Sequence, residues 1–164
     1  MPVRKYTLDE LRGFEARMGV ALPQAYRRYL TERGAGEDLR SKVSLLEDWC
    51  QPESEDEMPS GFLSRPFPWT DRWNDLTLVD PAEGWKARYY SAEWWQGSMR
   101  IQNLGCEAYR LLVITGQERG NIWCDERVSS GGGIFPLAWG KSPRVTIDEL
   151  LRSRAWRWLT SLVG

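Results

Sequence analysis

The sequence predicts a single α+β domain across residues 1–164, with helices at the N-terminus, a mainly antiparallel sheet and a closing helix. Three observations support this fold class. Two early segments show helical periodicity, three β-prone runs lie between residues 99 and 125, and a capping signal precedes an apolar stripe near the end of the chain. A length of 164 residues is that of one hydrophobic core rather than two.

The two N-terminal segments carry clear helix boundaries. Thr7 and Glu10 have the spacing of a capping box, and Gly19 is a natural end for the first helix. Pro23 fits the first turn of the second helix, where its missing N–H costs no hydrogen bond, and Gly34 ends that helix. The apolar stripe of the second helix consists of Leu22, Tyr26, Tyr29 and Leu30.

The middle of the chain is expected to be irregular. Residues 43–64 contain several acids and two prolines but no Lys or Arg, which favours a loop. Aromatic side chains are frequent from Phe62 to Tyr90. Within that stretch, Leu76 to Val79 are predicted to form a short strand that ends at Asp80-Pro81.

Three β-prone runs predict an antiparallel meander, and they cover residues 99–104, 109–115 and 121–125. The glycine-bounded loop 116–120 is typical of a hairpin. The continuous apolar run 111–114 indicates a central strand with both faces covered, and Trp123 is expected to face the core.

A last helix is expected after a flexible, glycine-rich segment at 129–133. Thr146 and Glu149 repeat the capping-box spacing at its start. The apolar stripe of this helix consists of Ile147, Leu150, Leu151, Trp158, Leu159 and Leu162.

The composition argues against most catalysis. The chain contains no histidine, which excludes Ser-His-Asp and Cys-His chemistry and removes the commonest metal ligand. Cys50, Cys106 and Cys124 are odd in number and lack CxxC spacing, so we expect reduced, partly buried thiols and neither a metal nor a cofactor. A net charge of −1 provides no field for nucleic acid, which we do not expect as a direct partner.

Three enzymatic alternatives are weaker than a binding role. A paired-carboxylate hydrolase such as a glycosidase needs no histidine, but nothing marks one pair among the 23 acids. The glycines at 131–133 lack the pattern of a phosphate cradle, so a flexible connection is favoured. Cys106 has no histidine to activate it, so a small packed residue at the sheet edge is favoured over a nucleophile. We therefore expect a protein that is not an enzyme.

The sequence also favours a cytoplasmic location. No apolar run approaches the roughly 18 residues of a membrane span. The first ten residues contain no apolar run resembling a signal peptide. We expect a soluble protein with no membrane partner.

Several motifs follow one another in a fixed order across most of the chain. They are Leu22-Pro23-x-x-Tyr26-Arg-x-Tyr29-Leu30, Gly105-Cys106-x-x-Tyr109-x-Leu111-Leu-Val-Ile-Thr-Gly116, Gly120-Asn-Ile-Trp123, Asp125-x-Arg127 and Gly133-Ile-x-Pro136-Leu. In these motifs the chain resembles the SUKH superfamily, which includes bacterial immunity proteins and fungal regulators of cell-wall synthesis. The acidic segment 43–64 and the tryptophan-rich middle match nothing in that pattern.

The resemblance implies a curved sheet flanked by N-terminal helices and a C-terminal helix, and it implies no catalysis. It points to an immunity protein, an antidote encoded beside a polymorphic toxin that it binds and blocks. The cognate toxin would be the protein partner, and a nuclease or a deaminase acting in the cytoplasm is favoured. The alternative is a regulatory scaffold of the cell-wall-regulator type.

Two regions are predicted to contact such a toxin. Acids of the 43–64 loop would speed association with a basic cleft, and nearby aromatic side chains would slow release. The alternative is a solvated, mobile loop. A second patch lies after the last strand of the meander, where the alternative is a structural ion pair. The candidate residues are Glu53, Glu55, Asp56, Glu57, Trp69, Trp73, Asp125, Glu126 and Arg127.

Overall fold

The computed structural model describes residues 3–36, 43–51, 53, 55–78, 84–128 and 132–153. The helices are α1 (Leu8–Met18), α2 (Gln24–Glu32), α3 (Trp85–Tyr89) and α4 (Ile147–Arg152), and four 3₁₀ turns add η1 (Leu46–Asp48), η2 (Glu55–Glu57), η3 (Leu76–Leu78) and η4 (Ala92–Trp95). The strands are β1 (Ser98–Gly105), β2 (Ala108–Val113), β3 (Ile122–Asp125) and β4 (Ile134–Pro136). The predicted α+β class is confirmed.

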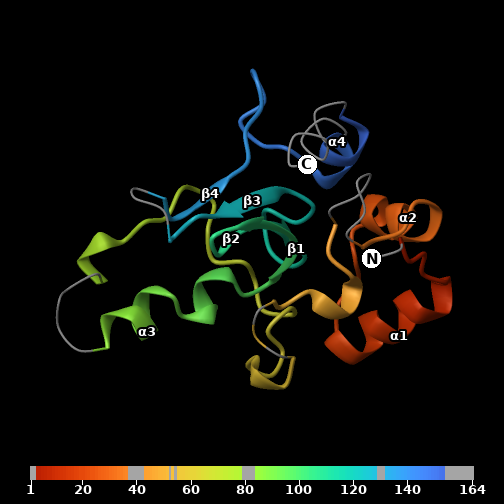
Figure 1. Ribbon diagram of the computed structural model, residues 1–164, viewed down its shortest axis with the longest axis horizontal. Helices are drawn as coiled ribbons and strands as arrows, with labels where there is room; N and C mark the ends of the chain where they lie inside the picture. Colours follow the sequence, from red (N-terminus) through yellow and green to blue (C-terminus); the bar gives the residue numbers. More distant parts are fainter. Residues whose placement is uncertain are drawn as a thin grey trace.

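The curved sheet has the order β1-β2-β3-β4, with every neighbouring pair antiparallel. In Figure 1, α1, α2 and α4 lie on one side of the sheet and α3 lies on the other. The central strand is buried on both faces, because Leu111, Leu112 and Val113 are all fully shielded from solvent. The predictions of a meander, of a central strand at 111–114 and of a buried Trp123 are confirmed.

Both outer edges of the sheet are covered by irregular segments. Along β1, the amide of Ser44 donates to Ile101 O at 2.8 Å, and the amide of Arg100 donates to Trp49 O at 2.9 Å. Along β4, Trp73 and Ile134 exchange two backbone hydrogen bonds of 2.8 Å. This cover satisfies edge groups that would otherwise pair with another chain. It also brings the 43–64 segment against the sheet, where it helps to form the site described below.

The predicted helix boundaries agree closely with the structure. Thr7 and Thr146 cap α1 and α4, each in a complete capping box with a glutamate three residues later. Gly19 ends α1 in the left-handed conformation, with φ of 65°. Pro23 is the N-cap of α2 rather than its first helical residue, a shift of one position that leaves its missing N–H equally harmless.

Two predicted elements differ from the structure. Leu76–Leu78 is a 3₁₀ turn instead of a strand, because the carboxylate of Asp75 accepts hydrogen bonds from the amide and the hydroxyl of Thr77 and so favours a local turn. The last helix is shorter than its apolar stripe suggested. Ser153 follows Arg152 in an extended conformation, and Trp158, Leu159 and Leu162 lie outside the described residues.

The capping box of α1 makes stability sensitive to acid. The pKa of Glu10 is lowered from 4.5 to about 2, because its carboxylate accepts hydrogen bonds from the Thr7 amide and the Arg4 guanidinium. A group with a depressed folded pKa stabilises fully above its unfolded value and loses that effect as pH falls through the folded value. Between pH 4.5 and 2, the urea midpoint of the wild type should therefore fall more steeply than that of Glu10→Gln. Parallel pH profiles would contradict this.

Candidate functional site

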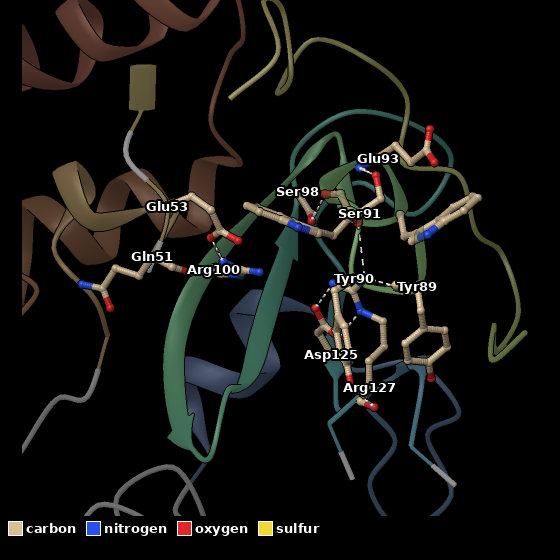
Figure 2. A network of polar contacts seen from close by, with 12 residues as sticks. Gln51, Glu53, Tyr89, Tyr90, Ser91, Glu93, Ser98, Arg100, Asp125 and Arg127 are labelled. Atoms are coloured by element: carbon tan, nitrogen blue, oxygen red, sulfur yellow. Dashed lines mark hydrogen bonds and ion pairs between the residues drawn. The ribbon is translucent and has the colours of Figure 1, made fainter. Parts of the chain in front are cut away.

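A pocket of about 180 Å³ opens on the sheet face that carries Arg100, Tyr109 and Asp125. Its lining comes from four parts of the chain: the 43–64 segment, the residue after α3, the β1–β2 hairpin, and the end of β3 with the turn that follows. The lining residues are Glu53, Tyr90, Arg100, Glu107, Tyr109, Asp125, Arg127 and Val128. Figure 2 shows the polar groups that meet around it.

One wall of the pocket is a buried ion pair at the end of β3. Arg127 forms a bidentate pair with Asp125, in which Nε donates to Oδ1 at 2.8 Å and Nη2 donates to Oδ2 at 2.7 Å. Its remaining Nη1 donates to the carbonyls of Tyr89 at 2.8 Å and Ser91 at 3.2 Å (Figure 2). Both side chains are at least 96% buried. The pair thus fixes the turn after β3 to the segment after α3.

The floor of the pocket is the guanidinium of Arg100. It lies between two aromatic rings, 4.1 Å from the centroid of Trp95 and 4.3 Å from that of Tyr109. Such stacking holds the planar group in one orientation. Its Nη1 donates to the carboxylate of Glu53 and to the backbone carbonyls of residues 50 and 51. Arg100 therefore ties the acidic segment to the sheet, and the Nε of this buried side chain finds no acceptor among the described residues.

The rim of the pocket includes a strained hairpin turn. Gly105 pairs with Ala108, so Cys106 and Glu107 form a two-residue turn, with φ of 50° and 59°. Turns of this kind strongly prefer Asn-Gly, because side chains disfavour positive φ at both positions. The strain is held in place by the long β1–β2 pairing. It presents Glu107 at the pocket and leaves the preceding Leu104 41% exposed.

The prediction of a packed Cys106 is wrong. The thiol belongs to the exposed turn rather than to a packed position at the sheet edge, because the two-residue turn lifts it beyond the last strand pair. Cys50 and Cys124 are buried, and burial raises the pKa of each thiol to about 11.

The three thiols should therefore differ in reactivity. At pH 8, an aromatic disulfide reagent is expected to titrate one thiol per native chain and three per urea-unfolded chain, since buried neutral thiols are poor nucleophiles. In Cys106→Ser the native value should fall to zero. Rapid native reaction of two or three thiols would contradict the burial of Cys50 and Cys124.

The contacts of two predicted acids tie the segment to the rest of the fold. Glu53 pairs with Arg100, as described above. Glu55 accepts from Arg17 of α1 at 3.0 Å and from the indole of Trp49 at 3.4 Å. Asp56 and Glu57 are exposed. The described residues of this segment are thus anchored to the sheet and to α1 at one end, while its acidic tip faces solvent.

The predicted aromatic contacts lie in a stacked cluster rather than standing alone. Trp73 stacks on Trp69 at 5.1 Å, on Trp94 at 4.9 Å and on Tyr89 at 5.7 Å between ring centroids. Trp69 and Trp73 are both half-buried. Because Tyr89 O accepts from Arg127, the cluster is connected to the pocket wall. Glu126 is half-buried beside the ion pair and does not line the pocket.

Sequence reasoning had missed most of the pocket, namely Tyr90, Arg100, Glu107, Tyr109 and Val128. One signal was present. Arg100 stands between Met99 and Ile101 in a run that is buried in every position from 98 to 102, and a charged residue in such a run needs buried partners. The partners themselves come from distant segments, which periodicity does not identify.

No group of three or more Cys, Asp or Glu side chains with metal-binding geometry occurs within the described ranges. In the same ranges, no helix is long and apolar enough to cross a membrane. Comparisons with family models, with curated proteins and with solved structures find no match to this chain.

Proposed function

We propose that this protein is an immunity protein, which binds a cognate bacterial toxin and blocks its active site by covering it. The observation that carries the proposal is the make-up of the pocket face. A preorganised polar floor lies beside Tyr90, which is 37% exposed, beside Val128 and beside the carboxylate of Glu107. Aromatic and aliphatic anchors around fixed polar groups are typical of protein-binding hot spots.

The charges of the pocket support recognition rather than turnover. Asp125 is fully engaged by Arg127, and Glu53 is engaged by Arg100. A general base needs a proton acceptor that can reach its substrate, whereas these carboxylates hold neighbouring arginines. Their main effect is to fix the shape of the face before a partner arrives. Preorganisation of this kind reduces the entropy lost on association.

The exposed acids support a partner with a basic cleft. Asp56 and Glu57 at the tip of the acidic segment, together with Glu107, would attract the cationic groups that a nucleic-acid-degrading toxin uses to hold phosphates. Such complementarity chiefly raises the rate of association. We place the encounter in the cytoplasm, where a nuclease or a deaminase finds its substrate. A standard interface of about 800 Å² per partner would cover the cleft without chemistry.

The proposal expects a neighbouring gene that encodes a large secreted protein with a C-terminal toxin domain, and the test is co-expression of this chain with that domain. Cells that make the domain alone should die, and cells that make both proteins should survive. The two proteins should also co-purify. A folded, well-expressed chain that gives neither survival nor co-purification would overturn the proposal.

A further inference from the structure

We propose that Arg100 is a receptor for a carboxylate that the partner inserts into the pocket. This inference rests on the proposed function, because it names the chemical group that the toxin presents to the site. The juxtaposition that carries it is one guanidinium edge without an acceptor, held flat between two aromatic rings on the floor of the pocket.

The two arginines of the pocket provide an internal comparison. Arg127 uses its Nε–Nη2 edge to grip both oxygens of Asp125, at 2.8 and 2.7 Å. All three hydrogen bonds of Arg100 to described residues leave from Nη1 instead. On the Nε–Nη2 edge of Arg100, which has the same shape as the edge that holds Asp125, Nε is buried without an acceptor and Nη2 forms no hydrogen bond to a described residue. That edge is the one that matches a carboxylate geometrically.

Leaving this edge without an acceptor costs free energy. The Arg100 side chain is only 6% exposed, and a buried guanidinium N–H without an acceptor costs more than the same group in water. Figure 2 shows Arg100 beside Glu53, with the Asp125–Arg127 pair farther along the sheet, and all four residues line the pocket. An oxygen that arrives through the pocket would therefore meet a donor already oriented by Trp95 and Tyr109.

The size of the pocket fits one acidic side chain. A volume of about 180 Å³ equals that of roughly six water molecules, which is enough for a carboxylate and its methylene stem. The walls from Tyr90 and Tyr109 would cover the stem. Glu107 at the rim opposes a second negative charge, so it should weaken the binding of any carboxylate.

The inference can be tested without the toxin. The probes are the Nα-acetyl amides of glutamate, glutamine and lysine: glutamate and glutamine share a stem and differ in charge, and lysine carries the opposite charge and no side-chain acceptor. Each is titrated into the ¹⁵N-labelled full chain at low salt, and the side-chain Nε–H resonance of Arg100 is followed. Only the glutamate probe should give a saturable downfield shift, and the glutamine probe should bind at least about tenfold more weakly.

Variants separate binding at Arg100 from a general surface effect. Arg100→Lys keeps the charge opposite Glu53 but lacks the planar edge, so the glutamate probe should bind about tenfold more weakly, as followed through the amides of Gly105–Ala108. Glu107→Gln should strengthen binding about threefold. Glu32→Gln, an exposed acid on α2 outside the pocket, should change nothing. Because Glu107→Gln alters only an exposed group, it keeps the test decisive even where Arg100→Lys fails to fold.

Four outcomes would overturn the inference: no saturable shift with glutamate, an equal response to lysine, unchanged binding after Arg100→Lys, or unchanged binding after Glu107→Gln. The result is separable from the toxin test. A chain that protects cells but ignores the glutamate probe keeps the proposed function and loses the carboxylate receptor. A chain that binds the probe but gives no protection keeps the carboxylate receptor and loses the proposed function.

Discussion

Asp125→Ala is expected to lower the free energy of unfolding by about 3–5 kcal/mol, because it leaves the guanidinium of Arg127 buried without a counter-charge. The Arg127 side chain is only 3% exposed and cannot reach solvent without breaking its bonds to the carbonyls of Tyr89 and Ser91. Urea unfolding followed by tryptophan fluorescence measures the loss.

The matched control removes both charges of the pair. Asp125→Leu combined with Arg127→Met leaves no unpaired ion, so this double variant should recover part of the stability that Asp125→Ala loses. The two carbonyls that Arg127 had satisfied would still be unpaired, which keeps the recovery incomplete. A loss below about 1 kcal/mol for Asp125→Ala would contradict the burial of the pair, since exposed pairs contribute no more than that.

Gly97→Ala is expected to cost about 2–5 kcal/mol, the sum of a left-handed backbone and a steric clash. Gly97 has φ of 69°, and a Cβ there would overlap Arg65 O and lie 2.6 Å from the Phe67 amide nitrogen. These are backbone atoms of the 65–67 segment, which passes over the start of β1. The clash therefore cannot be relieved by rotation of a side chain. Urea unfolding again provides the measurement.

Gly19→Ala separates the two causes. Gly19 has nearly the same φ, 65°, but a Cβ there would meet nothing within 4 Å. It should therefore show only the conformational cost, about 1–2 kcal/mol. Equal losses of unfolding free energy in the two variants would mean that the 65–67 segment does not pack closely against Gly97.

Local signals account for the parts of the fold that sequence reasoning predicted. The capping boxes at Thr7 and Thr146 are complete within four residues, and the apolar run 111–114, which lies between glycine-bounded turns, is typical of a doubly covered strand. The errors arose where side chains compete with backbone patterns. Asp75 turned a strand-like run into a 3₁₀ turn by accepting hydrogen bonds from Thr77.

The site was less predictable than the fold, for a physical reason. The carboxylate of Glu53 meets Arg100 across 47 positions of the chain, and Arg127 meets the carbonyl of Tyr89 across 38. Such contacts depend on how the edge segment and α3 pack on the sheet, which periodicity does not encode. Asp125 and Arg127 were singled out because they follow the end of a predicted strand, and they form the structural ion pair that was the alternative to a contact patch.

The most direct test of the account is the affinity of two alanine variants for the toxin domain identified by co-expression. Tyr90 and Leu8 are both exposed, 37% and 54%, but only Tyr90 lines the pocket. Isothermal titration should show binding weakened at least about tenfold by Tyr90→Ala, an interface hot-spot loss, and unchanged by Leu8→Ala. Equal affinities for wild type and Tyr90→Ala would contradict the claim that the pocket face binds the partner.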